Sequence, residues 1–332
     1  MSSTYFHKWS VQNKRSNGKG TISRVCFVLL LWCSIYANVS SQPLNLDSLW
    51  SRWNNKSLPD TARLNALLGI SEAEQNINAD TVFVHAQMGY QFAEMRNLAG
   101  YKMKFLFQMG RSRIQAGALG AAETFTKRSM ALAESLHDDE YHAKCLNLLG
   151  ATYKSQGDYA ASVEFHLRAS QLAEKLKDQK LLLATYLNLG NTYMGLKESD
   201  KYLHYSQEYL KLAEATRDTP AISIGLSCLG IAYHTLKNLP EALKYYTLGL
   251  QMAKAAGITR SSGTSYMQIG DVYALMDEPA LAIGKYRTAM GEYQAKGNKL
   301  GQAQTLYRIA KLYKTQFPDS TLFLAQRALE MA

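Results

Sequence analysis

The sequence predicts an all-α protein, a solenoid of about seven antiparallel helix pairs, because two markers recur along it at one spacing. The first marker is a glycine that follows Leu or Ile and precedes a tyrosine by three residues. It recurs every forty residues, at Gly150, Gly190, Gly230 and Gly270. The second marker is an Ala-Glu pair with the same spacing, beginning at Ala93, Ala133, Ala173 and Ala213. Two markers in one register indicate an array of stacked units and not a single globular core.

Residues 1–41 predict a secretory signal peptide with a long basic start. The apolar run from Val25 to Tyr36 follows a polar and basic segment, and it is too short to span a bilayer comfortably. Small and polar residues come next, with Val39 and Ser41 suitably placed before a cut ahead of Gln42. A buried strand or an uncleaved anchor is the alternative. The signal predicts export to the periplasm or cell envelope.

The net charge of +10 does not predict nucleic-acid binding once its position is considered. Five of the 37 basic residues precede Asp47, the first carboxylate. The remaining chain carries 32 basic against 27 acidic residues, a balance of +5 spread over its whole length. Such a surface is only mildly basic.

The helical part begins after the signal. Residues 42–59 contain the amphipathic segment LDSLWSRW, which we expect to cap the exposed end of the array. Pro59 and Asp60 start the first long helix, and Ala79 to Met95 is its partner. Residues 60–332 then form the solenoid, and its last second helix runs from about residue 319 to 332. Within each unit the first helix ends near a turn, at Gly157-Asp158, Lys197-Glu198, Lys237-Asn238 and Asp277-Glu278.

The in-phase glycines predict a close contact between the two helices of a pair. A glycine inside a helix costs about 1 kcal/mol relative to alanine, so its recurrence calls for a packing reason. Small residues twelve positions later fit that contact, at Ala122, Ser162, Ala242 and Ala282. We expect the tyrosines to fill the wider gap towards the next unit.

The repeat unit resembles the tetratricopeptide repeat (TPR), through the segments LLGATYKSQGDYAAS, NLGNTYMGLKESDKY, CLGIAYHTLKNLPEA and QIGDVYALMDEPALA. Its length is similar to the long variant in kinesin light chains and in exported regions of bacterial signalling proteins. The resemblance implies a right-handed superhelix whose first helices line the concave face. Three departures, Arg113 for tyrosine, Tyr202 for a small residue and Ala310 for glycine, predict less regular packing in their units.

The resemblance also implies where a partner binds. Ligand contacts are expected three before, one after and four after each glycine, positions that share one helix face. The polar candidates there, with two neighbours, are Asn147, Lys154, Asn188, Asn191, His234, Gln268 and Asp271. Amide and apolar side chains suit an extended peptide or a protein surface. A solvated face without a ligand is the alternative. The lysine that a terminal-carboxylate clamp needs is absent, which excludes that chaperone-docking mode.

Other chemistry is not predicted. Residues 137–142 contain two histidines and three carboxylates, but we expect them in a solvated turn, not at a metal. Cys145 and Cys228 lie at different phases of the repeat, so we interpret them as core-filling residues without a disulfide. Phosphate-binding loops, nucleophile elbows and HExxH motifs do not occur. The sequence therefore predicts no enzyme, no cofactor and no metal.

The leading prediction is a non-enzymatic, peptide-binding or protein-binding TPR scaffold exported to the cell envelope. A second is the sensory input region of a truncated bacterial sensor histidine kinase or helix-turn-helix regulator, since the chain stops at ALEMA within an unfinished helix. Membrane contact is then expected only through the N-terminal signal or a missing downstream segment. A third is a cytoplasmic peptide-responsive regulator, which requires the apolar run to be no signal.

Overall fold

The computed structural model describes residues 45–75, 77–259 and 262–313, and these residues form α-helices with no strand among them. The all-α solenoid is confirmed. The helices are α2 (Leu46–Asn54), α3 (Asp60–Ala73), α4 (Ala79–Met95), α5 (Ala99–Gln115), α6 (Leu119–Ser135), α7 (Asp139–Gln156), α8 (Tyr159–Leu176), α9 (Gln179–Gly195), α10 (Ser199–Thr216), α11 (Thr219–Thr235), α12 (Leu239–Ala255), α13 (Ser262–Leu275), α14 (Pro279–Ala295) and α15 (Lys299–Tyr313).

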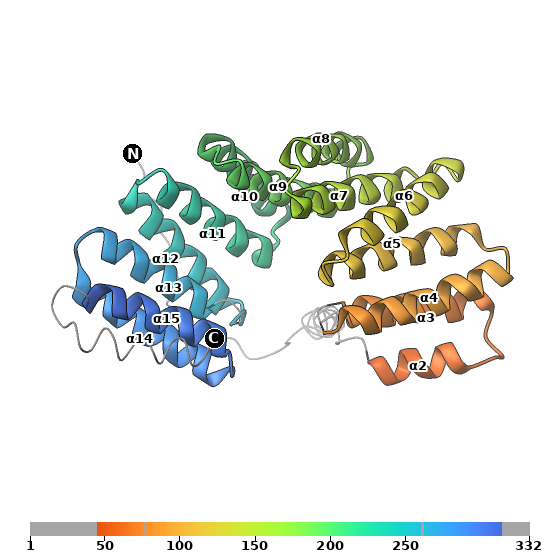
Figure 1. Ribbon diagram of the computed structural model, residues 1–332, viewed down its shortest axis with the longest axis horizontal. Coiled ribbons are helices and arrows are strands. Elements are labelled where there is room, and N and C mark those ends of the chain that lie inside the picture. Colours follow the sequence, from red (N-terminus) through yellow and green to blue (C-terminus); the bar gives the residue numbers. More distant parts are fainter. Residues whose placement is uncertain (1–44, 76, 260–261, 314–332) are drawn as a thin grey trace, which may run out of the picture.

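The helices pack in sequence along an arch (Figure 1), from α2 at one end over α7 to α10 and down to α15. Six pairs, α3/α4 to α13/α14, are described in full, and α15 is the first helix of a seventh. The predicted signal at 1–41 and the predicted last helix at 319–332 lie outside the described residues. None of the described helices combines the length and apolar character that a membrane span requires.

The short helix α2 covers the end of the first pair. Leu49 and Trp53 are buried in a core cluster with Leu64 and Leu67 of α3. Arg63 donates from its Nε to the carbonyl of Trp53 at 2.9 Å, and its guanidinium lies 5.1 Å from the Trp53 ring centroid. These contacts shield apolar surface that the terminal unit of an array would otherwise expose.

A residue in the left-handed conformation follows each helix from α4 to α14, in the turn that leads to the next helix. Positive φ angles occur at intervals of twenty residues, at Asn97, Gly117, His137, Gly157, Lys177, Lys197, Arg217, Lys237, Gly257, Asp277 and Gly297. The next residue donates its amide to a carbonyl five positions back, as Asp158 does to Tyr153 at 2.9 Å and Asp178 to Ala173 at 3.0 Å. This is the Schellman arrangement. The tyrosine marker and the alanine of the Ala-Glu marker are therefore equivalent positions, because the carbonyl of each accepts the hydrogen bond that ends its helix.

The in-phase glycines contact the second helix, but they make room for a ring rather than for close backbone approach. A Cβ built on Gly150 would lie 2.7 Å from the His166 ring, and one on Gly230 would lie 2.4 Å from Tyr246. Gly270 likewise faces Tyr286, at 2.6 Å. The ring-bearing residue comes sixteen positions after the glycine. The small residues twelve positions after it are buried as well, and Ser162 meets Thr192 of the next unit at 3.0 Å between hydroxyls.

Three of the tyrosines that follow the glycines, Tyr153, Tyr193 and Tyr233, stack on a ring of their own pair, so their main ring contact differs from the expected one. Tyr153 stacks on Phe165 of its own pair, with ring centroids 5.2 Å apart. Its hydroxyl donates to Glu123 of the preceding unit at 2.9 Å. Arg113, which replaces tyrosine in the second unit, also reaches back, lying 4.2 Å over the Phe83 ring and pairing with Asp80 at 2.7 Å. The cation therefore substitutes for the aromatic ring at this contact.

Candidate functional site

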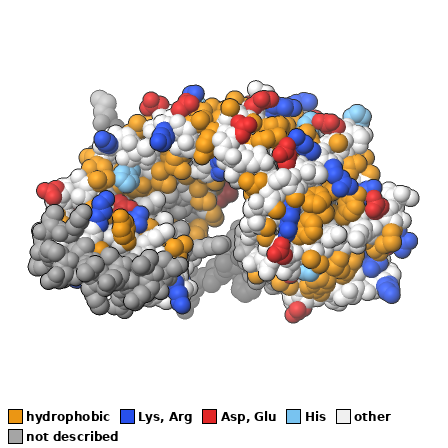
Figure 2. Space-filling model, in the orientation of Figure 1, with side chains coloured by type: hydrophobic (Ala, Val, Ile, Leu, Met, Phe, Trp, Pro, Cys, Tyr) orange, Lys and Arg blue, Asp and Glu red, His pale blue; other side chains and the backbone are white. Residues whose placement is uncertain are grey.

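The first helices of neighbouring pairs line the concave side of the arch. Contacts join α3 to α5, α5 to α7, α7 to α9 and α13 to α15, skipping the second helix between them. In a curved stack, elements on the inner side come closest together, so these contacts identify the inner surface. Figure 2 shows this side as an open space between the two arms of the arch.

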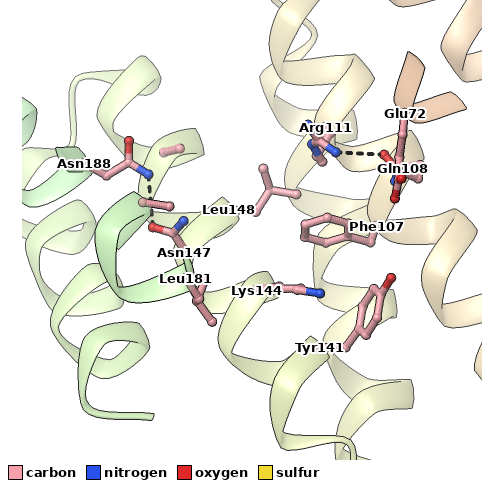
Figure 3. Close-up of a pocket in the computed structure, with 12 residues that line it drawn as sticks. Glu72, Phe107, Gln108, Arg111, Tyr141, Lys144, Asn147, Leu148, Leu181 and Asn188 are labelled. Carbon is pink, nitrogen blue, oxygen red and sulfur yellow. Dashed lines mark hydrogen bonds between the residues drawn. The ribbon is translucent and has the colours of Figure 1, made fainter. Parts of the chain in front are cut away.

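The larger cluster of polar side chains lies in a hollow of about 330 Å³ formed by α3, α5, α7 and α9, which we call the N-terminal hollow (Figure 3). Asn147 and Asn188, two of the predicted contact residues, line it together. Its other main lining residues are Glu72, Phe107, Gln108, Arg111, Tyr141 and Lys144. The Phe107 and Tyr141 rings meet edge to face with centroids 5.7 Å apart.

The sequence prediction missed Phe107 and Arg111, although the register contains them. They lie three before and one after Gly110, the same positions that select Asn147 and Asn191. The second unit has Arg113 in place of its tyrosine, which weakens the motif there. Extending the register by one unit would have found both residues.

A short chain of hydrogen bonds fixes Asn147. Its Oδ1 accepts from Asn188 Nδ2 at 3.1 Å and contacts His166 Nδ1 at 2.8 Å. Because this oxygen can only accept, His166 carries its proton on Nδ1. His166 comes from the second helix α8 and reaches Asn147 past Gly150, where any side chain would collide with its ring. Because Gly150 has no side chain, His166 of the second helix can reach Asn147 on the concave face.

His166 is a neutral imidazole in this position. Its side chain is fully buried, and Nε2 has no hydrogen-bond partner among the described residues. Burial, together with the charge of Lys154, lowers its pKa to about 3. An unfolded histidine has a pKa near 6.5, so acid favours the unfolded chain.

This buried histidine predicts a specific loss of stability in acid. Between pH 6.5 and 3 the unfolded chain binds the proton and the folded chain does not. Stability present above pH 6.5 is therefore lost as pH falls, by up to about 1.4 kcal/mol per pH unit. The control is His166→Tyr, which carries the residue found at Tyr246 and Tyr286. Urea titrations at several pH values should give a shallower pH slope for this variant, and equal slopes would contradict the assignment.

A second hollow, of about 460 Å³, lies between α11, α13, α14 and α15 and is called the C-terminal hollow. It contains His234 and Asp271, two further predicted residues. Asp271 Oδ1 accepts from the Tyr286 hydroxyl at 2.7 Å and from Arg308 Nε at 2.8 Å. Tyr286 is the ring facing Gly270, so here too the second helix contacts a concave residue through a glycine position.

The remaining predicted residues line neither hollow. Lys154, Asn191 and Gln268 are partly buried on their first helices. Burial lowers the pKa of the Lys154 ammonium. Met267, which the register placed on the same face, is instead buried against Tyr286 and Tyr293.

The histidine-rich segment 137–142 was expected in a turn, but only residues 137–138 lie there, because residues 139–142 form the first turn of α7. His137 is a left-handed turn residue, and Asp138 caps α7 by accepting from the Tyr141 amide at 2.9 Å. No group of three or more His, Cys, Asp or Glu side chains suited to a metal occurs in the described parts of the chain. Cys145 and Cys228 are buried free thiols, which confirms their interpretation as core residues, and burial raises the pKa of Cys145 to about 12.

Comparison with known proteins agrees with the repeat geometry. The family model of the tetratricopeptide repeat matches residues 142–176, nearly all of α7 and α8. The chain is a TPR-type protein. The matched segment contains Gly150, Asn147 and His166. The repeat that the family model recognises therefore also contributes to the N-terminal hollow. A comparison with curated protein sequences finds no match.

Solved structures share the fold of the TPR array at low sequence identity. Aspartyl phosphate phosphatase F from Bacillus subtilis is 12% identical, with a TM-score of 0.63, covering 92% of this chain and 80% of that one. A Rap protein complexed with competence and sporulation factor is 13% identical, with a TM-score of 0.58 and coverages of 85% and 80%. A signal-transduction ATPase with a TPR sensor from Pyrococcus horikoshii is 15% identical, with a TM-score of 0.64 and coverages of 86% and 45%.

Proposed function

We propose that the TPR array binds an extended peptide or protein segment along its concave face, with the N-terminal hollow as the principal contact. The observation that carries this proposal is the Asn147–Asn188 pair. The two amides come from neighbouring first helices and meet at 3.1 Å at the wall of the hollow. Amide side chains in such a row pair well with the backbone of an extended chain.

The fold comparison supports a peptide as the partner. The Rap protein of similar fold was solved in complex with competence and sporulation factor. The hollow also offers apolar surface beside its polar groups, from Phe107, Tyr141, Leu148 and Leu181. Apolar surface with a few placed polar groups is typical of binding sites. The role proposed is binding and not catalysis, because these side chains include no nucleophile with an adjacent base.

The test is selection of peptides from a random display library by the full chain, followed by measurement of Kd for the enriched peptides. Asn188→Ala should weaken binding at least about tenfold, since a backbone group of the bound peptide would be buried without its hydrogen-bond partner. Gln171→Ala is the matched control, because Gln171 is exposed on the second helix α8 and should leave Kd unchanged. Equal affinity for Asn188→Ala and wild type would contradict the proposed contact.

We also propose export to the cell envelope through residues 1–41, on the sequence pattern alone. The mature chain is then expected to begin at Gln42, and mass spectrometry of the protein from its native host measures this directly. Soluble protein that retains Met1 would contradict export and would favour a cytoplasmic peptide-responsive regulator.

A further inference from the structure

The polar groups of the N-terminal hollow are mostly hydrogen-bond donors and cations. Arg111 donates from Nη1 to Gln108 Oε1 at 3.2 Å, and this neutral amide is its hydrogen-bond acceptor. Glu72 lies in the same hollow, but in the described part of the chain no carboxylate oxygen comes within 4.0 Å of the Arg111 guanidinium. Arg111 is only partly exposed, and burial lowers its pKa although the negative charge of Glu72 opposes that shift, so the guanidinium has charge compensation nearby but no direct carboxylate partner.

Asn147 adds donors because its oxygen is already occupied. The Oδ1 atom takes both the Asn188 and the His166 hydrogen bonds. A carbonyl oxygen with two partners has little capacity left, which leaves the Nδ2 group to face a ligand. His166 therefore acts as a positioning residue that makes Asn147 a donor.

Two lysines extend the same pattern along α7. Lys144 lines the hollow, and its Nζ lies 4.7 Å from the Tyr141 ring centroid while pairing with the exposed Glu140 one turn earlier. Lys154 is on the same helix and is partly buried, with no carboxylate oxygen within 4.0 Å among the described residues. The hollow itself thus holds Arg111 and Lys144 against Glu72, with Lys144 also paired to Glu140 outside the hollow, and Lys154 adds a further positive charge farther along α7.

We propose that the N-terminal hollow selects a peptide with an acidic side chain, whose carboxylate accepts from Arg111 and from the Asn147 amide group. The aromatic pair Phe107 and Tyr141 then contacts the aliphatic part of that side chain. A carboxylate supplies Arg111 with a charged hydrogen-bond acceptor, which it does not have within 4.0 Å among the described residues. The proposal rests on the peptide-binding function and adds the chemistry of the residue that is recognised.

The test uses short fluorescent peptide pools, acetylated and amidated at their ends, with one central position fixed as Glu, Gln or Lys. The flanking positions are drawn from Ala, Ser, Leu and Tyr. Fluorescence anisotropy with the full chain should give a Kd for the Glu pool about tenfold or more below that for the Gln pool, with the Lys pool weakest. Arg111→Gln should abolish the preference. Arg168→Gln, at an exposed arginine on α8, should preserve it.

The outcomes separate this proposal from the function on which it rests. Equal binding of the Glu and Gln pools, with a loss in Asn188→Ala, would overturn acidic selection and leave peptide binding intact. No binding of any pool would count against both. A Gln pool with a free C-terminus that binds as tightly as the Glu pool, and loses that affinity in Arg111→Gln, would support carboxylate recognition and assign it to the chain end. An unchanged melting temperature shows that Arg111→Gln is folded.

Discussion

Tyr202→Ala is expected to lower the free energy of unfolding by about 3–5 kcal/mol, the usual cost of deleting a buried aromatic ring. Tyr202 is 2% exposed and packs with Cys228 and Ala232 of the next unit. It is also the ring nearest to Gly190, with Cδ2 3.3 Å from the position of an added Cβ. In the neighbouring units this place beside the glycine is taken by the residue sixteen positions after it, which here is Ser206.

The large and small residues of this unit are therefore exchanged along α10, and a second substitution should reverse the loss. Ser206→Tyr alone adds a ring to an occupied space and is expected to cost about 1–3 kcal/mol. Combined with Tyr202→Ala it recreates the arrangement of Ala242 and Tyr246, so the double variant should lie within about 1 kcal/mol of wild type. Urea unfolding of all four proteins measures the coupling. Additive losses would show that the two positions do not share one space.

Gly230→Ala is expected to destabilise the protein by about 1–3 kcal/mol, because its Cβ would lie 2.4 Å from the ring of Tyr246. Tyr246 is 2% exposed and belongs to a core with Leu250 and Ile269, so it has little room to move. Gly190→Ala is the matched control at the same position of the repeat, since the nearest atom to its Cβ would be in Tyr202 at 3.3 Å, a much looser contact than at Gly230. Alanine favours a helix over glycine by about 1 kcal/mol, so this variant should be neutral or slightly stabilised.

Thermal and urea unfolding of the two glycine variants provide the comparison. Both substitutions add one methyl group to an equivalent helix position, so propensity cancels in the difference between them. Equal melting temperatures would show that the Tyr246 ring can move aside without loss of stability, and that these glycines are not required for the ring contacts.

The forty-residue register predicts the helices and their order because it repeats, and each copy corrects the others. Ala79–Met95 is a helix with the predicted bounds, and the turns at Gly157 and Lys237 contain left-handed residues at those positions. The register also selected Asn147, and with its neighbour Asn188 the structure places it at one hollow. Periodicity shows which residues share one face of a helix, and one such face of each first helix lines the concave side of the array. The register can therefore predict residues on that side.

The register does not show which neighbour a side chain contacts. Tyr153 turned out to face its own pair and the preceding unit, because spacing along one helix says nothing about the two helices flanking it. The contact between His166 and Asn147 crosses between helices past a glycine, so no single-helix pattern contains it. Tyr202 and Ser206 show the same limit, since a departure from the motif was compensated four residues away on the same helix.

The left-handed turns give every helix and its turn from α5 to α14 the same length of twenty residues. Lys177 and Arg217 occupy equivalent turns, and each is followed by an aspartate that caps the next helix, Asp178 or Asp218. Removing residues 178–217 would join Lys177 to Asp218 and leave a complete turn and cap at the junction. The array is thus modular at the level of its backbone, and a lineage could lengthen or shorten its binding face by whole units without inventing a new connection.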